Sequence, residues 1–404
     1  MKQQSVIRSK PYHHWTGAFT WLLLLSLLGT SASTSAQDSA GPKKIAVFLP
    51  LYLDSAFDAA GNYKPGKIWP AYATQGMEFY EGMQAAIDSL NKEKVEVEIR
   101  VYDSRSLREK PEAVMNTAAF DNTSLLIGLV NVNEASLLAR IAQQKNIPFV
   151  NANLPNEAGI TANPYYTILN PTLQTHVTGL YKFLQKNYAL SPIIYFKKKG
   201  AVEDRLKNGF TEAERSSASV PLKMKTINLD DSISNDQLKM FLDTSKQNVC
   251  IIGSLDLNYG LALMQQLISL GKAYRITVVG MPTWEQADLT KAIYRGIEVV
   301  YSNPMYINPE NKTILQLQNH FRNRYFMRAS ENVYRGFETI YYYSKLLQTD
   351  STSLQENQVR QPQTPIGQYM IVPVTNKKTG QIDYYENKKL YFIRKQDGII
   401  KAVF

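Results

Sequence analysis

The alternation of apolar strands with amphipathic helices, beginning near residue 44, constrains the fold of this chain more than any other feature. An apolar run at 45–49 is followed by a polar and aromatic loop, a helix near 78–90 and a run at 95–103 that alternates apolar with polar residues. Strands joined through a helix run parallel, and the loops at their carboxyl ends meet at one edge of the sheet. The segment therefore predicts a parallel sheet with binding loops at that edge. The alternation at 95–103 predicts its outer strand.

The same alternation continues over most of the chain. We predict further strands at 125–128, 147–150, 193–196, 222–227, 249–253 and 276–280, separated by helices at 134–144, 173–187, 203–214, 236–245 and 259–270. Two longer helices follow at 312–326 and 331–347, then a flexible loop at 351–365 and two hairpin turns within 367–404. Because so long a chain exceeds what one core accommodates, the pattern predicts an α/β protein of two doubly wound parallel-sheet lobes.

Residues 1–36 have the order of a secretion signal. Three basic residues precede an apolar core at 21–28, and small residues follow as far as Ala36. The core is shorter than the ~20 residues that a membrane helix needs, so we predict cleavage near Ala36 and a periplasmic protein that does not span the membrane. An uncleaved N-terminal anchor is the alternative. No cysteine follows the core closely, which argues against a lipoprotein.

Composition and motifs argue against most catalytic classes. The formal net charge is +10, but Lys and Arg are scattered, so we interpret the charge as a solvated surface and, with export, predict no nucleic-acid partner. The sequence lacks a phosphate-binding loop, a dinucleotide fingerprint, a nucleophile elbow and a His-Glu-x-x-His motif. After the signal only His176 and His320 remain, and the single cysteine, Cys250, fits a buried strand thiol. We therefore predict no enzymatic activity, no cofactor and no metal site, and a surface or packing role for His176.

Four segments carry a family resemblance through their order and spacing: 44–51 with 76–91, 101–104, 127–151, and 311–347 with its Tyr334-Arg335-Gly336-Phe337-Glu338. They resemble the type I periplasmic binding proteins, the leucine/isoleucine/valine-binding class of extracytoplasmic solute receptors. Together they cover nearly the whole chain after the signal. The loop at 54–75 and the helix after it are most similar to family members from Bacteroidota.

The resemblance implies two α/β lobes joined by three crossings, with the ligand in a cleft between them. It places residues 43–170 and about 303–385 in the N-terminal lobe, and 171–302 with about 386–404 in the C-terminal lobe. Backbone N–H groups at the strand ends and helix N-termini would hold a carboxylate or another polar group. Closure of the lobes over the ligand would create the form that a partner recognises.

The resemblance also places first-lobe ligand contacts in two asparagine-rich loops, at Asn131, Asn133, Asn151 and Asn153. Amino-acid binders of the family tend to have Ser, Thr and Ala there. The amides offer neutral donors and acceptors instead, which suit an amide, peptide or sugar ligand. Their alternative role is as turn and helix-cap residues.

In the second lobe the resemblance places candidate ligand contacts at Asp256, Trp284 and Glu285. Of these, Glu285 is the residue expected to meet a ligand ammonium group. The chain has Lys197-Lys198-Lys199-Gly200 where relatives often have Asp-Tyr-Gly, and this run is either solvated or attracts an anion. Trp69 and Tyr72, in the long loop at 54–75, are candidates for aromatic cover over a ligand. Their alternative role is to cover the hinge or the surface of the lobe.

These expectations combine into one predicted function and one alternative. We predict an exported, monomeric solute-binding protein that captures a small polar ligand, such as an amino acid, in the cleft for a transporter or sensor. Its partners would be that small-molecule ligand and a membrane permease or another envelope protein. The alternative is a ligand-free cell-envelope scaffold or regulator of cell-wall enzymes, because a fold does not fix a function.

Overall fold

The computed structural model of the protein describes residues 6–7, 41–64, 70–229, 233–349 and 353–403. The predicted signal peptide lies outside these residues except for positions 6 and 7, and Trp69 lies outside them as well. None of the helices in the described ranges combines the length and the apolar composition that crossing a membrane requires.

Two compact units make up the chain. Unit 1 comprises Met1–Ala152 and Arg328–Asn357, and unit 2 comprises Asn153–Met327 and Gln358–Phe404. The chain therefore passes from one unit to the other three times. The lobe boundaries expected from the family resemblance, near residues 170, 302 and 385, stay a prediction.

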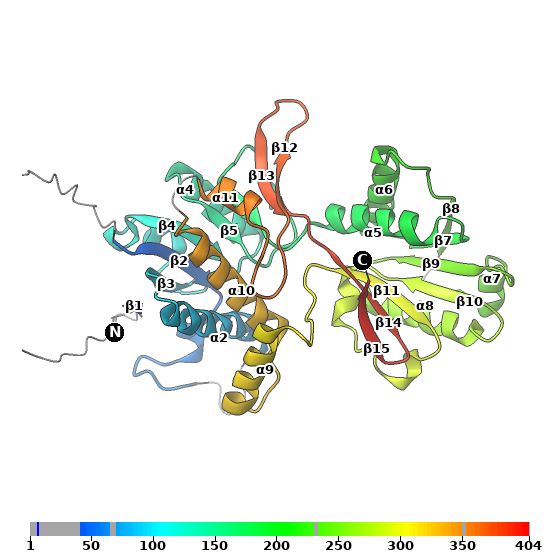
Figure 1. The fold of residues 1–404 in the computed structure, drawn as a ribbon, viewed down its shortest axis with the longest axis horizontal. Coiled ribbons are helices and arrows are strands. Elements are labelled where there is room, and N and C mark those ends of the chain that lie inside the picture. The colour runs from blue at the N-terminus through cyan, green and yellow to red at the C-terminus, as the bar shows by residue number, and fades with distance from the viewer. Residues whose placement is uncertain (1–5, 8–40, 65–69, 230–232, 350–352, 404) are drawn as a thin grey trace, which may run out of the picture. The chain divides into compact units, whose positions relative to one another are not determined.

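Unit 1 is built around parallel strands (Figure 1). Its elements are β1 (Val6–Ile7), β2 (Lys43–Leu49), α1 (Leu53–Ala56), α2 (Ala71–Lys92), β3 (Val97–Asp103), α3 (Pro111–Met115), the 3-10 helix η1 (Ala118–Phe120), β4 (Thr123–Gly128), α4 (Val132–Gln144), β5 (Phe149–Asn151) and α10 (Glu331–Leu346). The strand order is β1-β3-β2-β4-β5, in which β2, β3, β4 and β5 run parallel and β1 pairs antiparallel with β3. The four parallel strands therefore direct their carboxyl ends to one edge of the sheet.

Helices α2 and α10 pack against each other through glycines. A Cβ at Gly82 would overlap the carbonyl of Val333, and a Cβ at Gly336 would overlap the carbonyl of Phe79. The two backbones therefore touch at positions where neither residue has a side chain. This contact holds a helix from the C-terminal part of the chain against the helix that follows the first long strand.

Gly82→Ala and Gly336→Ala should each lower the free energy of unfolding by about 1–3 kcal/mol, because the added methyl group must push the two backbones apart. In an unobstructed helix the same change stabilises by roughly 0.5–1 kcal/mol, so the sign of the effect tests the close contact. Urea denaturation measures it, with Asp88→Ala at an exposed position of α2 as the control. A stabilising effect at either glycine would contradict the packing described.

Unit 2 has a second, mostly parallel sheet. Its elements are β6 (Tyr166–Ile168), α5 (Leu173–Tyr188), β7 (Ile193–Lys198), α6 (Ala201–Ser216), β8 (Met224–Leu229), α7 (Asn235–Lys239), β9 (Gln247–Gly253), α8 (Leu257–Leu270), β10 (Arg275–Val279), η2 (Pro282–Gln286), η3 (Ala292–Tyr294), β11 (Glu298–Asn303), α9 (Lys312–Tyr325), β12 (Ile371–Thr375), β13 (Ile382–Asn387), β14 (Tyr391–Gln396) and β15 (Ile399–Val403). Strands β8-β7-β9-β10-β11 are parallel in that order, and the antiparallel hairpin β14–β15 pairs with β11. A second hairpin, β12–β13, pairs with β6. The two predicted hairpin turns are confirmed.

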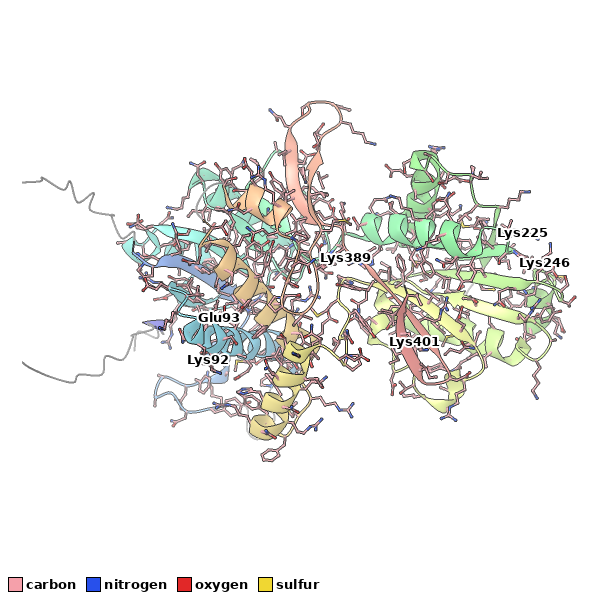
Figure 2. All side chains as sticks on the ribbon, in the orientation of Figure 1. Lys92, Glu93, Lys225, Lys246, Lys389 and Lys401 are labelled. Carbon is pink, nitrogen blue, oxygen red and sulfur yellow. The ribbon has the colours of Figure 1, made fainter. Side chains whose placement is uncertain are left out.

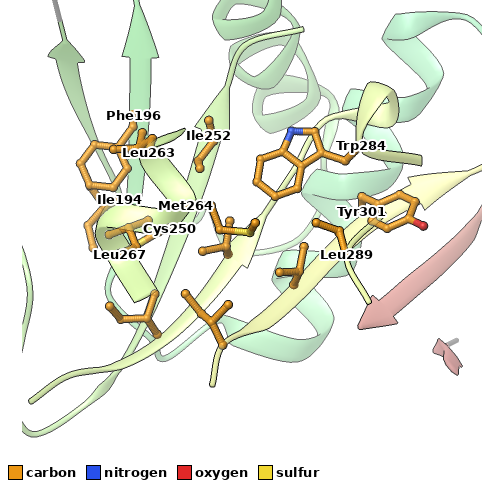
Figure 3. Packing of buried hydrophobic residues seen from close by; sticks show 14 of the residues in the cluster. Ile194, Phe196, Cys250, Ile252, Leu263, Met264, Leu267, Trp284, Leu289 and Tyr301 are labelled. Carbon is orange, nitrogen blue, oxygen red and sulfur yellow. The ribbon is translucent and has the colours of Figure 1, made fainter. Parts of the chain in front are cut away.

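The core of unit 2 includes the single cysteine and a tryptophan (Figure 3). Cys250 on β9 is fully buried in the same apolar cluster as residues of α8, which confirms the predicted strand thiol. Trp284 of η2 is fully buried in this cluster too. A Cβ at Gly280 would overlap its indole ring, and a Cβ at Gly260 would lie 3.0 Å from it. The two glycines make room for a flat ring between α8 and the end of β10.

Most elements lie where the sequence predicts them, and the differences have local causes. Helix α2 begins at Ala71, well before residue 78. The prediction missed its first turns because the residues buried there, Ala73 and Gly76, are small and show no apolar pattern. Helix α7 is shorter than the predicted 236–245. The sequence does not predict β6, whose three residues are too few for a pattern, or β11.

The stretch at 351–365, predicted as a flexible loop, contains a helix. Leu354–Arg360 form α11, so the loop prediction fails for these residues. Gln358 is buried, and its amide donates a hydrogen bond to Thr167 Oγ1 on β6 at 3.0 Å. The polar residues of this stretch predict a loop, but one of them, Gln358, is buried and has a hydrogen-bond partner.

His176, predicted to be either a surface or a packing residue, is buried on α5 of unit 2. Its Nδ1 lies 2.8 Å from Ser302 Oγ of β11. Burial lowers the pKa of the imidazole from 6.5 to about 3. The folded protein therefore keeps this side chain neutral, and the packing role is confirmed.

His176 should make the stability of the protein depend on pH. Because its folded pKa lies below the unfolded value, its contribution is fully present above pH 6.5 and is lost as the pH falls toward about 3. His176→Gln should reduce the fall in the free energy of unfolding across this window, by at most about 1.4 kcal/mol per pH unit. Urea denaturation at each pH measures the slope, and His320→Gln, at an exposed position, should keep the wild-type slope. An unchanged slope in His176→Gln would contradict a neutral buried imidazole.

Candidate functional site

The carboxylate of Asp103 forms hydrogen bonds with the loops at the carboxyl ends of both β2 and β3. Asp103, the last residue of β3, accepts backbone N–H groups from Leu51, Tyr52 and Leu53 at 3.0, 3.1 and 2.8 Å. It also accepts the N–H of Arg105 at 2.9 Å. Tyr52 adopts a left-handed backbone with φ of 54°. The four hydrogen bonds offset the cost of that conformation and fix the loop.

Tyr52 lies in an aromatic and cationic cluster at this edge. Its ring packs edge-on against Tyr72 of α2, with centroids 4.7 Å apart, and the Arg105 guanidinium lies 5.8 Å from the Tyr52 centroid. Tyr72 is 54% exposed. This predicted cover residue therefore lies at the edge of the sheet with a second tyrosine beside it, and its role over a ligand stays a prediction.

Arg105 links this cluster to the start of α4. Its Nη2 lies 3.2 Å from Glu134 Oε2, and the same carboxylate oxygen accepts the Asn131 N–H at 2.8 Å. The Asn131 side chain accepts the Glu134 N–H at 2.9 Å, which completes a capping box at the N-terminus of the helix. The edge site is defined here as Tyr52, Tyr72, Ser104, Arg105, Asn131 and Glu134.

Three buried polar atoms of the edge site have no hydrogen-bond partner among the described residues: Ser104 Oγ, Arg105 Nε and Glu134 Oε1. The hydroxyl and the guanidinium nitrogen can donate, and the carboxylate oxygen can accept. A buried polar atom without a partner costs about 1–3 kcal/mol. The edge site therefore has two donors and one acceptor that no described residue uses.

The four asparagines predicted to contact a ligand have different positions. Asn131 is the helix cap of α4, which is the alternative role considered for it, and a ligand contact there stays a prediction. Asn133 is exposed in the first turn of the same helix. Asn151 is fully buried at the end of β5, and the Asn153 carbonyl accepts a hydrogen bond from Asn170 at 2.8 Å.

In unit 2 the last two residues of β7, Lys197 and Lys198, are paired with carboxylates. Lys197 Nζ lies 2.5 Å from Asp204, and Lys198 Nζ lies 3.1 Å from Asp256 Oδ2. Asp256 also caps α8, because its Oδ1 accepts the Tyr259 N–H at 3.1 Å. That hydrogen bond and Lys198 hold the pKa of the Asp256 carboxyl below its usual range. Both contacts belong to the protein itself, and a ligand contact at Asp256 stays a prediction.

Trp284 and Glu285 lie in η2, directly after β10. The Trp284 ring is 0% exposed and fills the space that Gly260 and Gly280 leave in the core of unit 2. Its position is that of a core residue, which the sequence could not distinguish from a ligand contact because both uses favour a large aromatic ring. Glu285 is half-buried, and its expected role stays a prediction.

Four residues of the edge site were not predicted from the sequence: Tyr52, Ser104, Arg105 and Glu134. Each follows the carboxyl end of β2, β3 or β4 within a few positions. The rule that ligands bind at the carboxyl ends of parallel strands points to these positions as well as to the asparagine loops.

Clusters of three or more His, Cys, Asp or Glu able to hold a metal ion do not occur in the described part of the chain.

Asp103→Asn should lower the free energy of unfolding by about 1–3 kcal/mol, because the new amide nitrogen cannot accept the N–H groups that now bond to the carboxylate. Urea denaturation measures the change. Asp121→Asn, at an exposed position of the same unit, is the control and should stay within about 0.5 kcal/mol of wild type. Equal losses in the two variants would contradict the role of Asp103 at the strand ends.

No protein-family model and no curated protein matches the chain. Solved structures match its fold. A branched-chain amino acid ABC transporter structure from Rhodospirillum rubrum gives a TM-score of 0.65 at 12% identity, over 90% of this chain and 100% of that chain. An ABC transporter substrate-binding protein from Desulfitobacterium hafniense gives 0.57 at 14% identity, over 89% and 99%.

A third match is a branched-chain amino acid ABC transporter periplasmic ligand-binding protein from Burkholderia xenovorans. It gives a TM-score of 0.57 at 13% identity, over 90% of this chain and 94% of that chain. The matches extend over most of both chains, and the strand and helix order described above accounts for them. The chain therefore has the fold of the type I periplasmic binding proteins of branched-chain amino acid ABC transporters.

Proposed function

We propose that the protein is an exported solute-binding protein that captures a small polar molecule of the amino-acid kind at the edge site. The three buried polar atoms without partners carry the proposal. Ser104 Oγ and Arg105 Nε would donate to a ligand carboxylate, and Glu134 Oε1 would accept from a ligand ammonium group. Binding would relieve the cost of leaving these atoms buried and unpaired.

Other residues of the edge site would complete the contact. The rings of Tyr52 and Tyr72 would cover the apolar part of the ligand, since tyrosine combines a large contact area with a polar group. Among the predicted asparagines, Asn133 is exposed next to Glu134 and is the one that we propose as a ligand contact. The capping box would hold Glu134 in place and so keep its free oxygen at the site.

The partner that we propose is a membrane permease or sensor that receives the loaded protein. The solved structures that share the fold are named as ABC transporter binding proteins, which supports this use of the fold without fixing the ligand. The scaffold alternative requires no ligand at all, and ligand binding therefore distinguishes the two.

A thermal-shift screen with amino acids, dipeptides and sugars tests the proposal. A compound present at 100 times its dissociation constant should stabilise the wild-type protein by about 2.7 kcal/mol. Arg105→Met should abolish the shift, because it removes the guanidinium but keeps an apolar side chain of similar length. Arg108→Met is the matched control: Arg108 is exposed and pairs with Asp54 at 3.5 Å, so this variant should respond as the wild type does.

The proposal fails if no compound raises the melting temperature, and the scaffold alternative would then be favoured. It also fails if Arg108→Met loses the response together with Arg105→Met, because the effect would then follow net charge and not the edge site. Circular dichroism of both variants confirms that the fold is retained.

A further inference from the structure

Unit 2 contains a groove lined by lysines and apolar residues. Its volume is about 570 Å³, within the range of about 300–1,000 Å³ that is usual for small-molecule sites. It lies between α5 and the segment 388–392 that leads into β14, and it opens to solvent. Four of its twelve lining residues are lysines, and none is Asp or Glu.

The floor of the groove is apolar. Phe183 of α5 stacks on Phe392 of β14, with centroids 4.4 Å apart and an interplanar angle of 19°. Gly179 allows Leu390 to approach α5, since a Cβ there would lie 2.6 Å from Leu390 Cδ1. This floor is suited to an apolar chain or ring, which leaves water when it lies on these side chains.

Lysines border the groove on both sides. Lys182 and Lys186 are exposed one turn apart on α5, and Lys388 and Lys389 come from the opposite segment. Lys388 forms an ion pair with the buried carboxylate of Glu386. Lys182 and Lys389, with no Asp or Glu among the lining residues, give the groove a positive charge.

We propose that this groove binds a free anionic amphiphile, a carboxylate or phosphate attached to an apolar chain or ring. The apolar part would lie on Phe183, Leu390 and Phe392, and the anionic group would pair with Lys182 and Lys389. An inorganic anion would leave the apolar floor exposed, and a neutral solute would leave the lysine charges unmatched. The groove and the edge site share no residue, so this inference does not depend on the proposed solute-binding function.

Isothermal titration with sodium decanoate tests the inference. Lys182→Glu combined with Lys389→Glu should weaken decanoate binding at least tenfold, because two attractive charges become repulsive. Lys225→Glu with Lys246→Glu makes the same change of charge elsewhere in unit 2, and Figure 2 shows these two lysines at the opposite end of the unit from Lys389. Lys225 lies 5.1 Å from the Phe241 centroid and Lys389 lies 4.9 Å from the Tyr391 centroid, so each pair of changes removes one cation–π contact. The control should bind as the wild type does.

Chain length provides an independent measurement. Octanoate, two methylenes shorter than decanoate, should bind roughly 10- to 20-fold more weakly if the chain lies on the apolar floor. If the Glu variant fails to fold by circular dichroism, Lys182→Gln with Lys389→Gln takes its place and should still weaken binding severalfold. The inference is overturned if wild type does not bind decanoate, if the control weakens binding equally, or if the protein binds only vesicles of anionic phospholipid.

Discussion

Parallel pairing of β2, β3, β4 and β5 is the constraint on which unit 1 depends. A parallel neighbour can be reached only through a crossover, so helices must cover the sheet and the strand ends must gather at one edge. Contact between the backbones of α2 and α10 brings one such helix pair together. Asp103 links the loops at that edge, because its carboxylate accepts backbone N–H groups from the loop after β2 and from the loop after β3. The edge site is a product of this geometry.

Much of the fold could be predicted because its signals are local. The apolar runs of β2, β4, β7, β9 and β10 and the helical periodicity between them mark the elements without knowledge of their neighbours. Where tertiary contacts decide, the sequence was a poor guide. Helix α11 depends on a buried amide, Gln358, that bonds to Thr167 far away in the chain, and no nearby residue indicates that partner.

The candidate site was less predictable than the fold, because the same residue type serves several ends. Asn131 was predicted as a ligand contact, and in the structure its side chain caps α4. Arg105 is informative only once Glu134 and Tyr52 are known to surround it. Charge is equally ambiguous: Lys198 is paired with a carboxylate, whereas Lys182 and Lys389 line a groove with an apolar floor. Nothing within the sequence around each lysine separates the two cases.

The glycine contact between α2 and α10 also sets an order of events during synthesis. Next to it, Asn332 Nδ2 of α10 donates a hydrogen bond to Glu78 Oε2 of α2 at 2.9 Å, across 254 residues of chain. A chain is made from its N-terminus, so the partner of α2 becomes available only after the long segment that separates Glu78 from Asn332. Until then the face of α2 that contains Gly82 lacks the helix against which it packs. Helix α2, made early, therefore cannot complete this contact until α10, one of the last elements of unit 1, has been made.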